Sequence, residues 1–144
     1  MTLSPALSPH KWRPLAAAWV VALASSLAVL FIGEVMGQAP CNLCWFQRAF
    51  MFPLAIILGL AAFRSDRGVT PYAAALSLLG WLVALAHLLL YVGVIPAPII
   101  PCGEGPSCSS ETMAVGGVPL PLLSLAAFTL ILALLLLFQR RLKS

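Results

Sequence analysis

The sequence predicts an all-α integral membrane protein, a four-helix bundle that forms a single domain over residues 1–144 with both termini in the cytoplasm. Hydrophobic residues make up 62% of the chain and charged residues only 8%, whereas charged residues are about 25% of a typical soluble domain. The apolar residues fall into four separate stretches, each near the roughly 20 residues that a helix needs to cross a bilayer. The connections between these stretches leave no room for a soluble domain.

The basic residues indicate on which side of the membrane each connection lies. Seven of the eight Lys and Arg residues fall at the two ends of the chain and in the connection between the second and third apolar stretches: Lys11, Arg13, Arg64, Arg67, Arg140, Arg141 and Lys143. This is the positive-inside pattern of a four-span protein with cytoplasmic termini. The net charge of +4 therefore reports topology, and we expect no nucleic-acid partner. All four cysteines then lie at or beyond the outer face, where disulfides persist.

The first helix is predicted over about residues 15–36, after a polar tail of residues 1–14. Its apolar run is longer than the roughly 7–15 residues of a signal-peptide core, so we expect it to be retained as a membrane span. Glu34 lies near the outer end of this helix. We interpret it as an interfacial carboxylate in contact with water, and an ion pair with Arg48 is the alternative.

The second helix is predicted over about residues 42–63 and opens on a Cys-x-x-Cys motif formed by Cys41 and Cys44. Cysteines at this spacing lie about one helical turn apart, close enough to form a disulfide. The reactive thiolate is favoured at helix N-termini and beside positive charge, and Arg48 follows Cys44 by four residues on the same helical face. Because an arginine within a bilayer is costly and usually functional, the stretch predicts a redox-active pair at the membrane surface.

The third helix, about residues 70–94, contains His87. An ionisable side chain within a span is a functional candidate by default, although a hydrogen bond between helices would equally explain a histidine there. The fourth helix, about residues 120–138, is almost purely apolar, and we expect it to pack against the other helices or face lipid.

Between these helices lies an outer loop, about residues 95–119, that holds Cys102 and Cys108. Its many proline and glycine residues predict an irregular, turn-rich segment without regular helix or strand. A disulfide between the two cysteines would close a ring so small that it removes little chain entropy. This favours an exchangeable disulfide over a structural one.

Three interpretations of the four cysteines follow from the residues alone. In a disulfide relay, an incoming thiolate attacks the loop pair, the loop exchanges with the helix pair, and the electrons leave to a lipid-soluble acceptor such as a quinone, where Arg48 stabilises the developing negative charge. Alternatively, the four thiolates bind zinc, although the outer compartment is oxidising. In the third interpretation both disulfides are inert, which leaves the intramembrane Arg48 unexplained. We adopt the relay and expect no metal site.

Four short motifs carry a resemblance to a known family. They are CNLCWFQR at residues 41–48 and PLAIILG at 53–59, supported by GWLVALAH at 80–87 and PCGEGPSC at 101–108. Together with the four-helix topology, they make the chain similar over nearly its whole length to the quinone-dependent disulfide-bond formation proteins, the DsbB family. In particular, the chain resembles the short Gram-positive-type branch called BdbC. The four-helix vitamin K epoxide reductases also use a quinone, but in them the loop pair precedes the Cys-x-x-Cys, and here the order is reversed.

The resemblance implies a catalytic role for each cysteine. Cys102 matches the family cysteine that forms a mixed disulfide with a thioredoxin-fold partner. Cys108 matches its loop mate, which exchanges with the position of Cys41. Cys44 matches the cysteine nearest to the quinone. The protein would therefore be a quinone-dependent protein-disulfide oxidoreductase.

The resemblance also implies a cofactor, a partner and a location. The cofactor is a quinone, ubiquinone or menaquinone, whose interaction Arg48 supports, and His87 falls near a family histidine as a weaker candidate for the same site. The partner is a DsbA- or BdbD-like thiol oxidase outside the cytoplasm, which the protein would reoxidise to sustain disulfide formation during protein folding. The location is the bacterial cytoplasmic (inner) membrane, with the redox cysteines on its outer face.

Two features depart from the best-known enterobacterial members of that family. The stretch between Cys102 and Cys108 is shorter, and Gln47 stands where those members have a glutamate. The short spacing is typical of the other branch. The resemblance therefore does not extend to a loop rearrangement that separates the two loop cysteines.

Overall fold

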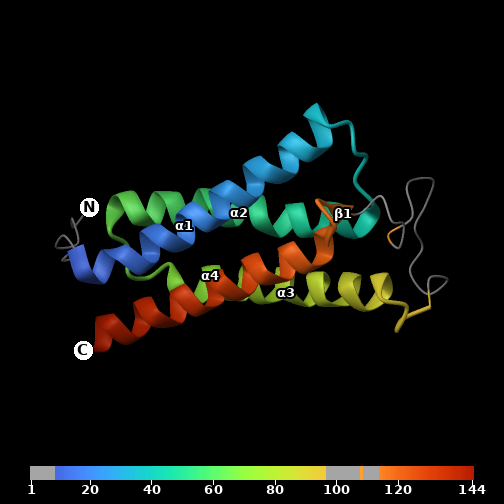
Figure 1. The fold of residues 1–144 in the computed structure, drawn as a ribbon. Helices are drawn as coiled ribbons and strands as arrows, with labels where there is room; N and C mark the ends of the chain where they lie inside the picture. The colour runs from blue at the N-terminus through green and yellow to red at the C-terminus, as the bar shows by residue number, and fades with distance from the viewer. Residues whose placement is uncertain (1–8, 97–107, 109–113) are drawn as a thin grey trace.

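The protein is a bundle of four long helices with a small hairpin at one end (Figure 1). The computed structural model describes residues 9–96, 108 and 114–144. The first helix begins at the same end of the bundle at which the last helix ends, as the ribbon shows. The helices are α1 (Pro9–Leu30), α2 (Asn42–Arg64), α3 (Thr70–Tyr91) and α4 (Leu120–Lys143). The predicted all-α class with four spanning helices is confirmed, since all four are long and apolar enough to cross a membrane.

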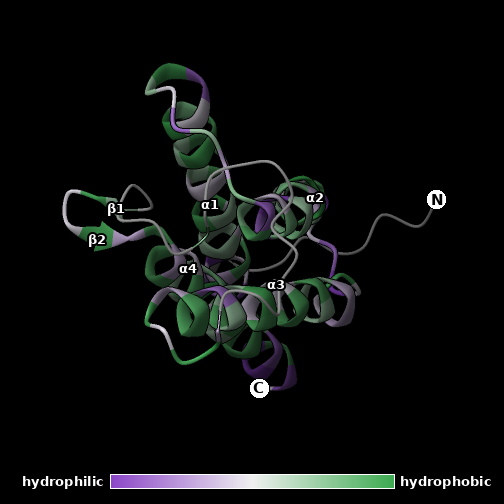
Figure 2. Cartoon of the chain, turned by 90° about the vertical axis from the view of Figure 1, so that its right-hand side faces the viewer, coloured by the Kyte–Doolittle hydropathy of each residue, from purple (hydrophilic) through white to green (hydrophobic). Residues whose placement is uncertain are grey.

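The surfaces of the helices are as apolar as their interior. Figure 2 shows hydrophobic residues on the outward-facing sides of the bundle, and hydrophilic residues gathered at the C-terminal end of α4. Large apolar side chains such as Ile56, Phe63 and Leu136 are more than half exposed. Exposed side chains of this kind on all sides are expected where the surrounding solvent is lipid.

Helix α1 at its start and helix α4 at its end extend beyond the predicted bounds. α1 begins at Pro9 and continues through Pro14, which lacks the N–H that would bond to the carbonyl of His10 one turn earlier. Arg141 of α4 donates a hydrogen bond of 2.7 Å to that carbonyl, so the freed acceptor is satisfied. α4 itself runs to Lys143, and basic side chains in a last turn favour the helix through its dipole.

At the end of the bundle that carries Cys41, α1 and α3 are closed by glycines. α1 continues as a π-helical segment, η1 (Phe31–Val35), and Gly37 follows with a positive φ of 68°. α3 ends at Tyr91, short of the predicted residue 94, and Gly93 has a φ of 80°. Only glycine adopts such angles without a steric cost, so these residues set where the helices stop.

The last part of the outer loop forms a hairpin that the sequence analysis did not predict. Strands β1 (Ala114–Val115) and β2 (Val118–Pro119) pair antiparallel. The two residues between them, Gly116 and Gly117, both have positive φ, as the tight two-residue hairpin turn requires. The prediction of a segment without strands was wrong here, and the rest of that loop, except residues 95–96 and 108, lies outside the described residues.

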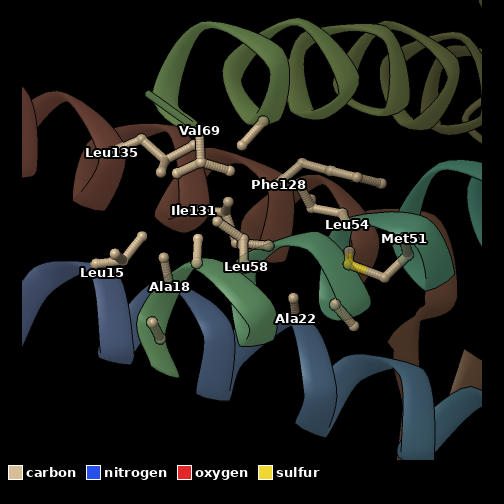
Figure 3. Packing of buried hydrophobic residues seen from close by; sticks show 14 of the residues in the cluster. Leu15, Ala18, Ala22, Met51, Leu54, Leu58, Val69, Phe128, Ile131 and Leu135 are labelled. Carbon is tan, nitrogen blue, oxygen red and sulfur yellow. The ribbon is translucent and has the colours of Figure 1, made fainter. Parts of the chain in front are cut away.

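The core is built by small and large side chains that interlock between helices (Figure 3). Ala18 and Ala22 of α1 leave room for Leu54 and Leu58 of α2. Residues of α4, among them Phe128, complete the cluster, and all of these side chains are buried. Each helix packs against two neighbours, in the order α1, α2, α3, α4 and back to α1.

Gly80 of α3 lies against the ring of Phe128 of α4. A methyl group at this position would overlap the ring of Phe128, which is fully buried and has nowhere to move. We therefore expect Gly80→Ala to destabilise the protein by about 1–3 kcal/mol, the usual cost of overpacking a core. Thermal unfolding in detergent measures the effect, with Leu79→Ala, at a half-exposed neighbour on the same helix, as control. An unfolding temperature for Gly80→Ala at or above that of the wild type would contradict this packing.

Candidate redox site and adjoining cavity

Cys41 and Cys44 face each other at the start of α2. Cys41 is the N-cap residue, with an extended backbone, and its carbonyl accepts a hydrogen bond of 3.1 Å from the N–H of Trp45. Cys44 lies in the first turn, and the two Sγ atoms are 3.1 Å apart as free thiols. The pair is thus placed to form a disulfide without moving the helix, because the spacing of the motif already brings the two side chains together.

Cys108, from the loop before α4, packs against this pair. Cys108 and Cys41 are each 1% exposed. They share an apolar cluster with Leu43 and Leu90, and a hydrogen bond joins the two cysteine side chains. The structure therefore brings together three of the four cysteines that the sequence analysis singled out, whereas Cys102 lies outside the described residues.

The environment of Cys41 sets which thiol of the pair is reactive. A hydrogen bond with the thiol of Cys44, together with burial of the sulfur, raises the pKa of Cys41 to about 11. Since the thiolate is the nucleophilic form, reduced Cys41 stays protonated at neutral pH. Cys44 is left as the nucleophile of the pair.

His87 stands behind Cys41 in a chain of buried polar groups. Its Nε2 lies 3.8 Å from the Sγ of Cys41 and 3.2 Å from the carbonyl oxygen of Cys108. Its Nδ1 is 3.0 Å from the Nε2 of Gln47, whose Oε1 accepts a hydrogen bond of 2.6 Å from Ser124. The histidine is fully buried, so all of its polar contacts are with the protein.

A cavity of about 390 Å³ lies on the other side of Cys44. This volume is within the range of about 300–1,000 Å³ that is usual for small-molecule sites. Its walls are mostly apolar and come from the outer half of α1, the turn before α2, the start of α2 and the start of α4. The polar side chains that line it are Ser25, Gln38, Cys44, Gln47, Arg48 and Ser124.

The cavity is partly open, at exposed residues of α1 and α4. Figures 1 and 2 show that the outer end of α1 diverges from the other helices. Ala24 and Ala28 of α1 and Leu123 of α4 line the cavity and are also exposed on the surface of the bundle. Because these surfaces face lipid in a spanning protein, the opening leads to the bilayer.

Arg48 places a positive charge in the wall of this cavity. Its guanidinium donates a hydrogen bond of 2.9 Å to the carbonyl of Val29 and lies 5.4 Å from the ring centre of Trp45. The side chain is only 8% exposed. Gly33 of η1 lets α1 come close, since a methyl group there would lie 3.0 Å from the Arg48 Nη2 atom.

The structure separates residues that the sequence analysis had considered together. Glu34 is exposed and forms no ion pair with Arg48, so the interpretation as a carboxylate in contact with water agrees with its position. Arg48 lines the cavity, whereas His87 is absent from its lining and contacts Cys41 and Cys108 instead. Ser124 had no signal in the sequence, because a serine in an apolar helix is unremarkable until its partner is known.

Four membrane-length helices that carry a Cys-x-x-Cys pair against a third cysteine define a membrane protein with a cluster of cysteine thiols at one end. Comparison with known proteins specifies the family. Residues 10–138 match the family described as disulfide bond formation protein DsbB. The chain belongs to the DsbB family, which implies that it is a membrane thiol oxidoreductase.

Individual relatives agree with this assignment. The chain is 55% identical over 141 residues to a probable disulfide formation protein of Metapseudomonas resinovorans, covering 96% of this chain and 98% of the relative. It is 36% identical over 124 residues to disulfide bond formation protein C of Bacillus subtilis, covering 85% and 90% of the two chains. A probable disulfide formation protein of Deinococcus radiodurans is 41% identical over 128 residues, or 82% and 83% of the two chains. No solved structure gives a significant match.

Proposed function

We propose that the protein reoxidises a thioredoxin-fold dithiol oxidase outside the cytoplasm and passes the electrons to a membrane quinone, ubiquinone or menaquinone. One observation carries the proposal. Cys44 and Arg48 line a cavity that opens toward lipid, while Cys41, in contact with Cys44, also contacts the loop cysteine Cys108. The Cys-x-x-Cys pair thus connects a thiol exchange site with a site for a lipid-soluble molecule.

The residues around the cavity suit a quinone. Its apolar walls fit a hydrophobic ring, and its few polar groups include Arg48 and Gln47 of α2. When bound, a quinone supplies the two-electron acceptor that the dithiol needs. Arg48 would bind it and stabilise negative charge that develops on a ring oxygen, because a preorganised cation in a water-poor site is an effective electrostatic partner. Among the described residues, no carboxylate pairs with this guanidinium to neutralise it.

The cysteines would act in a fixed order. A partner thiolate attacks the Cys102–Cys108 disulfide at Cys102, which forms a mixed disulfide and leaves the electron pair on Cys108. The Cys108 thiolate attacks Cys41 of the Cys41–Cys44 disulfide, which forms a Cys41–Cys108 bond and leaves the electron pair on Cys44. The partner's second thiolate resolves the mixed disulfide, and Cys102 then reforms its bond to Cys108 and releases Cys41. The reduced helix pair is reoxidised at the cavity.

The proposed orientation places the cysteine end of the bundle outside the cytoplasmic membrane of a bacterium. The grouping of Lys and Arg at the opposite end, at the starts and ends of the helices, supports it. The partner is supported by family membership, which implies a thiol oxidase partner.

Arg48→Met tests the cavity as the quinone site. Hydrogen bonds to charged groups contribute roughly 1.5–3 kcal/mol, so we expect the apparent KM for quinone to rise by about tenfold or more. The rate at saturating quinone should change less. Steady-state quinone reduction measures both constants, and Arg64→Met, which removes a cation from the other end of α2, is the matched control. An unchanged KM in Arg48→Met would remove Arg48 from the site.

One observation favours a second candidate, a metal site. The ligand atoms of Cys41, Cys44 and His87 all lie within 4.8 Å of one another, and thiolate and imidazole are the ligands of structural zinc. Metal analysis of the purified protein decides between the two functions. If the purified protein holds stoichiometric zinc and reduces no quinone, a zinc site replaces the relay as the function.

A further inference from the structure

The direction of the hydrogen bonds around His87 follows from one group that can only accept, the backbone carbonyl of Cys108. The ring's Nε2 lies 3.2 Å from the carbonyl oxygen of Cys108, and a carbonyl only accepts, so Nε2 must carry the proton. In a neutral imidazole, Nδ1 is then the acceptor, and Gln47 must offer it the NH₂ group at 3.0 Å. The amide oxygen of Gln47 consequently faces Ser124, whose hydroxyl donates to it at 2.6 Å.

We propose that Gln47 and Ser124 are positioning residues for the thiol exchange between Cys108 and Cys41, which they serve by holding His87 in the Nε2–H tautomer. In that tautomer the Nε2–H group donates a hydrogen bond to the backbone carbonyl of Cys108. The same N–H also faces the Sγ of Cys41, which lies 3.8 Å from Nε2. The inference rests on the proposed exchange between these two cysteines, and it assigns His87 to the cysteine side of α2 instead of the cavity.

The exchange needs such positioning because its two sulfurs come from different parts of the chain. The Cys108 thiolate must approach Cys41 in line with the Cys41–Cys44 bond, so that the new bond forms as the electron pair leaves on Cys44. Holding both groups in this geometry removes most of the entropy cost of aligning them for the reaction. When the Cys41–Cys108 bond later breaks, the electron pair stays on Cys41, and the N–H of His87 is placed to donate to that sulfur. With the other tautomer, a lone pair on Nε2 would face both the carbonyl of Cys108 and the Cys41 sulfur.

The tautomer can be read directly, since His10 and His87 are the two histidines of the chain. In His10→Gln protein with ¹⁵N-labelled histidine, a nuclear magnetic resonance spectrum reports His87 alone, and the structural contact of His10 is kept because it uses the backbone carbonyl. We expect a protonated Nε2 and an unprotonated Nδ1. Gln47→Glu in the same background places an acceptor opposite Nδ1 and should protonate it. A protonated Nδ1 already present with Gln47 would overturn the proposal.

The effect on exchange is measured without quinone or partner. The double variant Cys44→Ser with Cys102→Ser leaves Cys41 and Cys108, whose disulfide can be titrated against a glutathione redox buffer. Adding Ser124→Ala should lower its equilibrium constant by about fivefold, the effect of one lost hydrogen bond. Ser124→Thr, which keeps the hydroxyl, should restore it, and Ser26→Ala, at a buried serine that bonds the carbonyl of Ala22 within its own helix, should leave it unchanged.

Equal constants for Ser124→Ala and Ser26→Ala would overturn the proposal. If Ser124→Ala does not fold, the tautomer of His87, measured with and without Gln47→Glu, decides whether the proposal holds. These outcomes are separate from the proposed quinone reaction. If His87 is in the Nε2–H tautomer and Ser124→Ala shifts the Cys41–Cys108 equilibrium in a protein that reduces no quinone, this inference holds and only the proposed acceptor is contradicted.

Discussion

Cys44→Ser should reduce quinone no faster than a sample without protein, while its remaining disulfide rearranges from Cys102–Cys108 to Cys41–Cys108. Of the three cysteines that the structure describes, Cys44 is the one that lines the cavity. Without its thiol, the electrons delivered through Cys108 have no route to that cavity. The Cys41 thiol can instead exchange with the Cys102–Cys108 disulfide at Cys108, which forms Cys41–Cys108 and releases Cys102 as a thiol. Because Cys41 and Cys108 are in contact and buried, the new disulfide is protected and should accumulate. Ultraviolet absorbance follows the quinone, and mass spectrometry of unreduced peptides identifies the trapped bond.

Asn42→Ser is the control for this variant, because Asn42 lies within the same motif but is exposed and absent from the cavity lining. It should retain quinone reduction near the wild-type rate. Sustained quinone reduction by Cys44→Ser would show that another group donates the electrons, and the assignment of Cys44 would then be wrong.

Cys102→Ser should abolish oxidation of the partner while leaving the Cys41–Cys44 disulfide able to form. The proposed order gives Cys102 the first contact with the partner, so its loss blocks entry of electrons. The Cys41–Cys44 disulfide can form without the loop cysteines, because its two sulfurs lie 3.1 Å apart at the start of α2. Alkylation of free thiols measures partner oxidation, and peptide mapping after addition of quinone reports the Cys41–Cys44 bond. Loss of that bond in Cys102→Ser would contradict the order of the relay.

Much of the fold could be predicted from the sequence, because the features that determine it are local. Long apolar stretches give spanning helices whatever their neighbours are, and the Cys-x-x-Cys spacing brings Cys41 and Cys44 together within one turn. The bounds of α1 could not be predicted in this way. Continuation of that helix through Pro14 depends on Arg141, which lies at the far end of the chain. The hairpin turn at Gly116 and Gly117 did have a sequence signal, the Gly-Gly pair, which the proline-rich context outweighed.

The polar contacts of the site were less predictable, because they join residues of different helices. The resemblance named His87 as a weaker candidate for the same site as Arg48, but its position along α3 does not specify which side of α2 it will meet. The structure shows the side that carries Cys41 and Cys108. Ser124 bonds to Gln47, which lies 77 residues earlier in the chain. A contact of this kind follows from how the helices pack, and no periodicity within either helix indicates it.

The most direct test of the central claim is a stoichiometric measurement on the wild-type protein. Purified protein in detergent would be mixed with a known amount of a reduced thioredoxin-fold dithiol partner and an excess of quinone, and both products would be counted. The proposed relay predicts one quinol for each partner disulfide formed, because two electrons leave the dithiol and two reach the acceptor. Partner oxidation without quinone reduction, in folded protein, would contradict the claim and leave the cavity beside Cys44 and Arg48 without its proposed ligand.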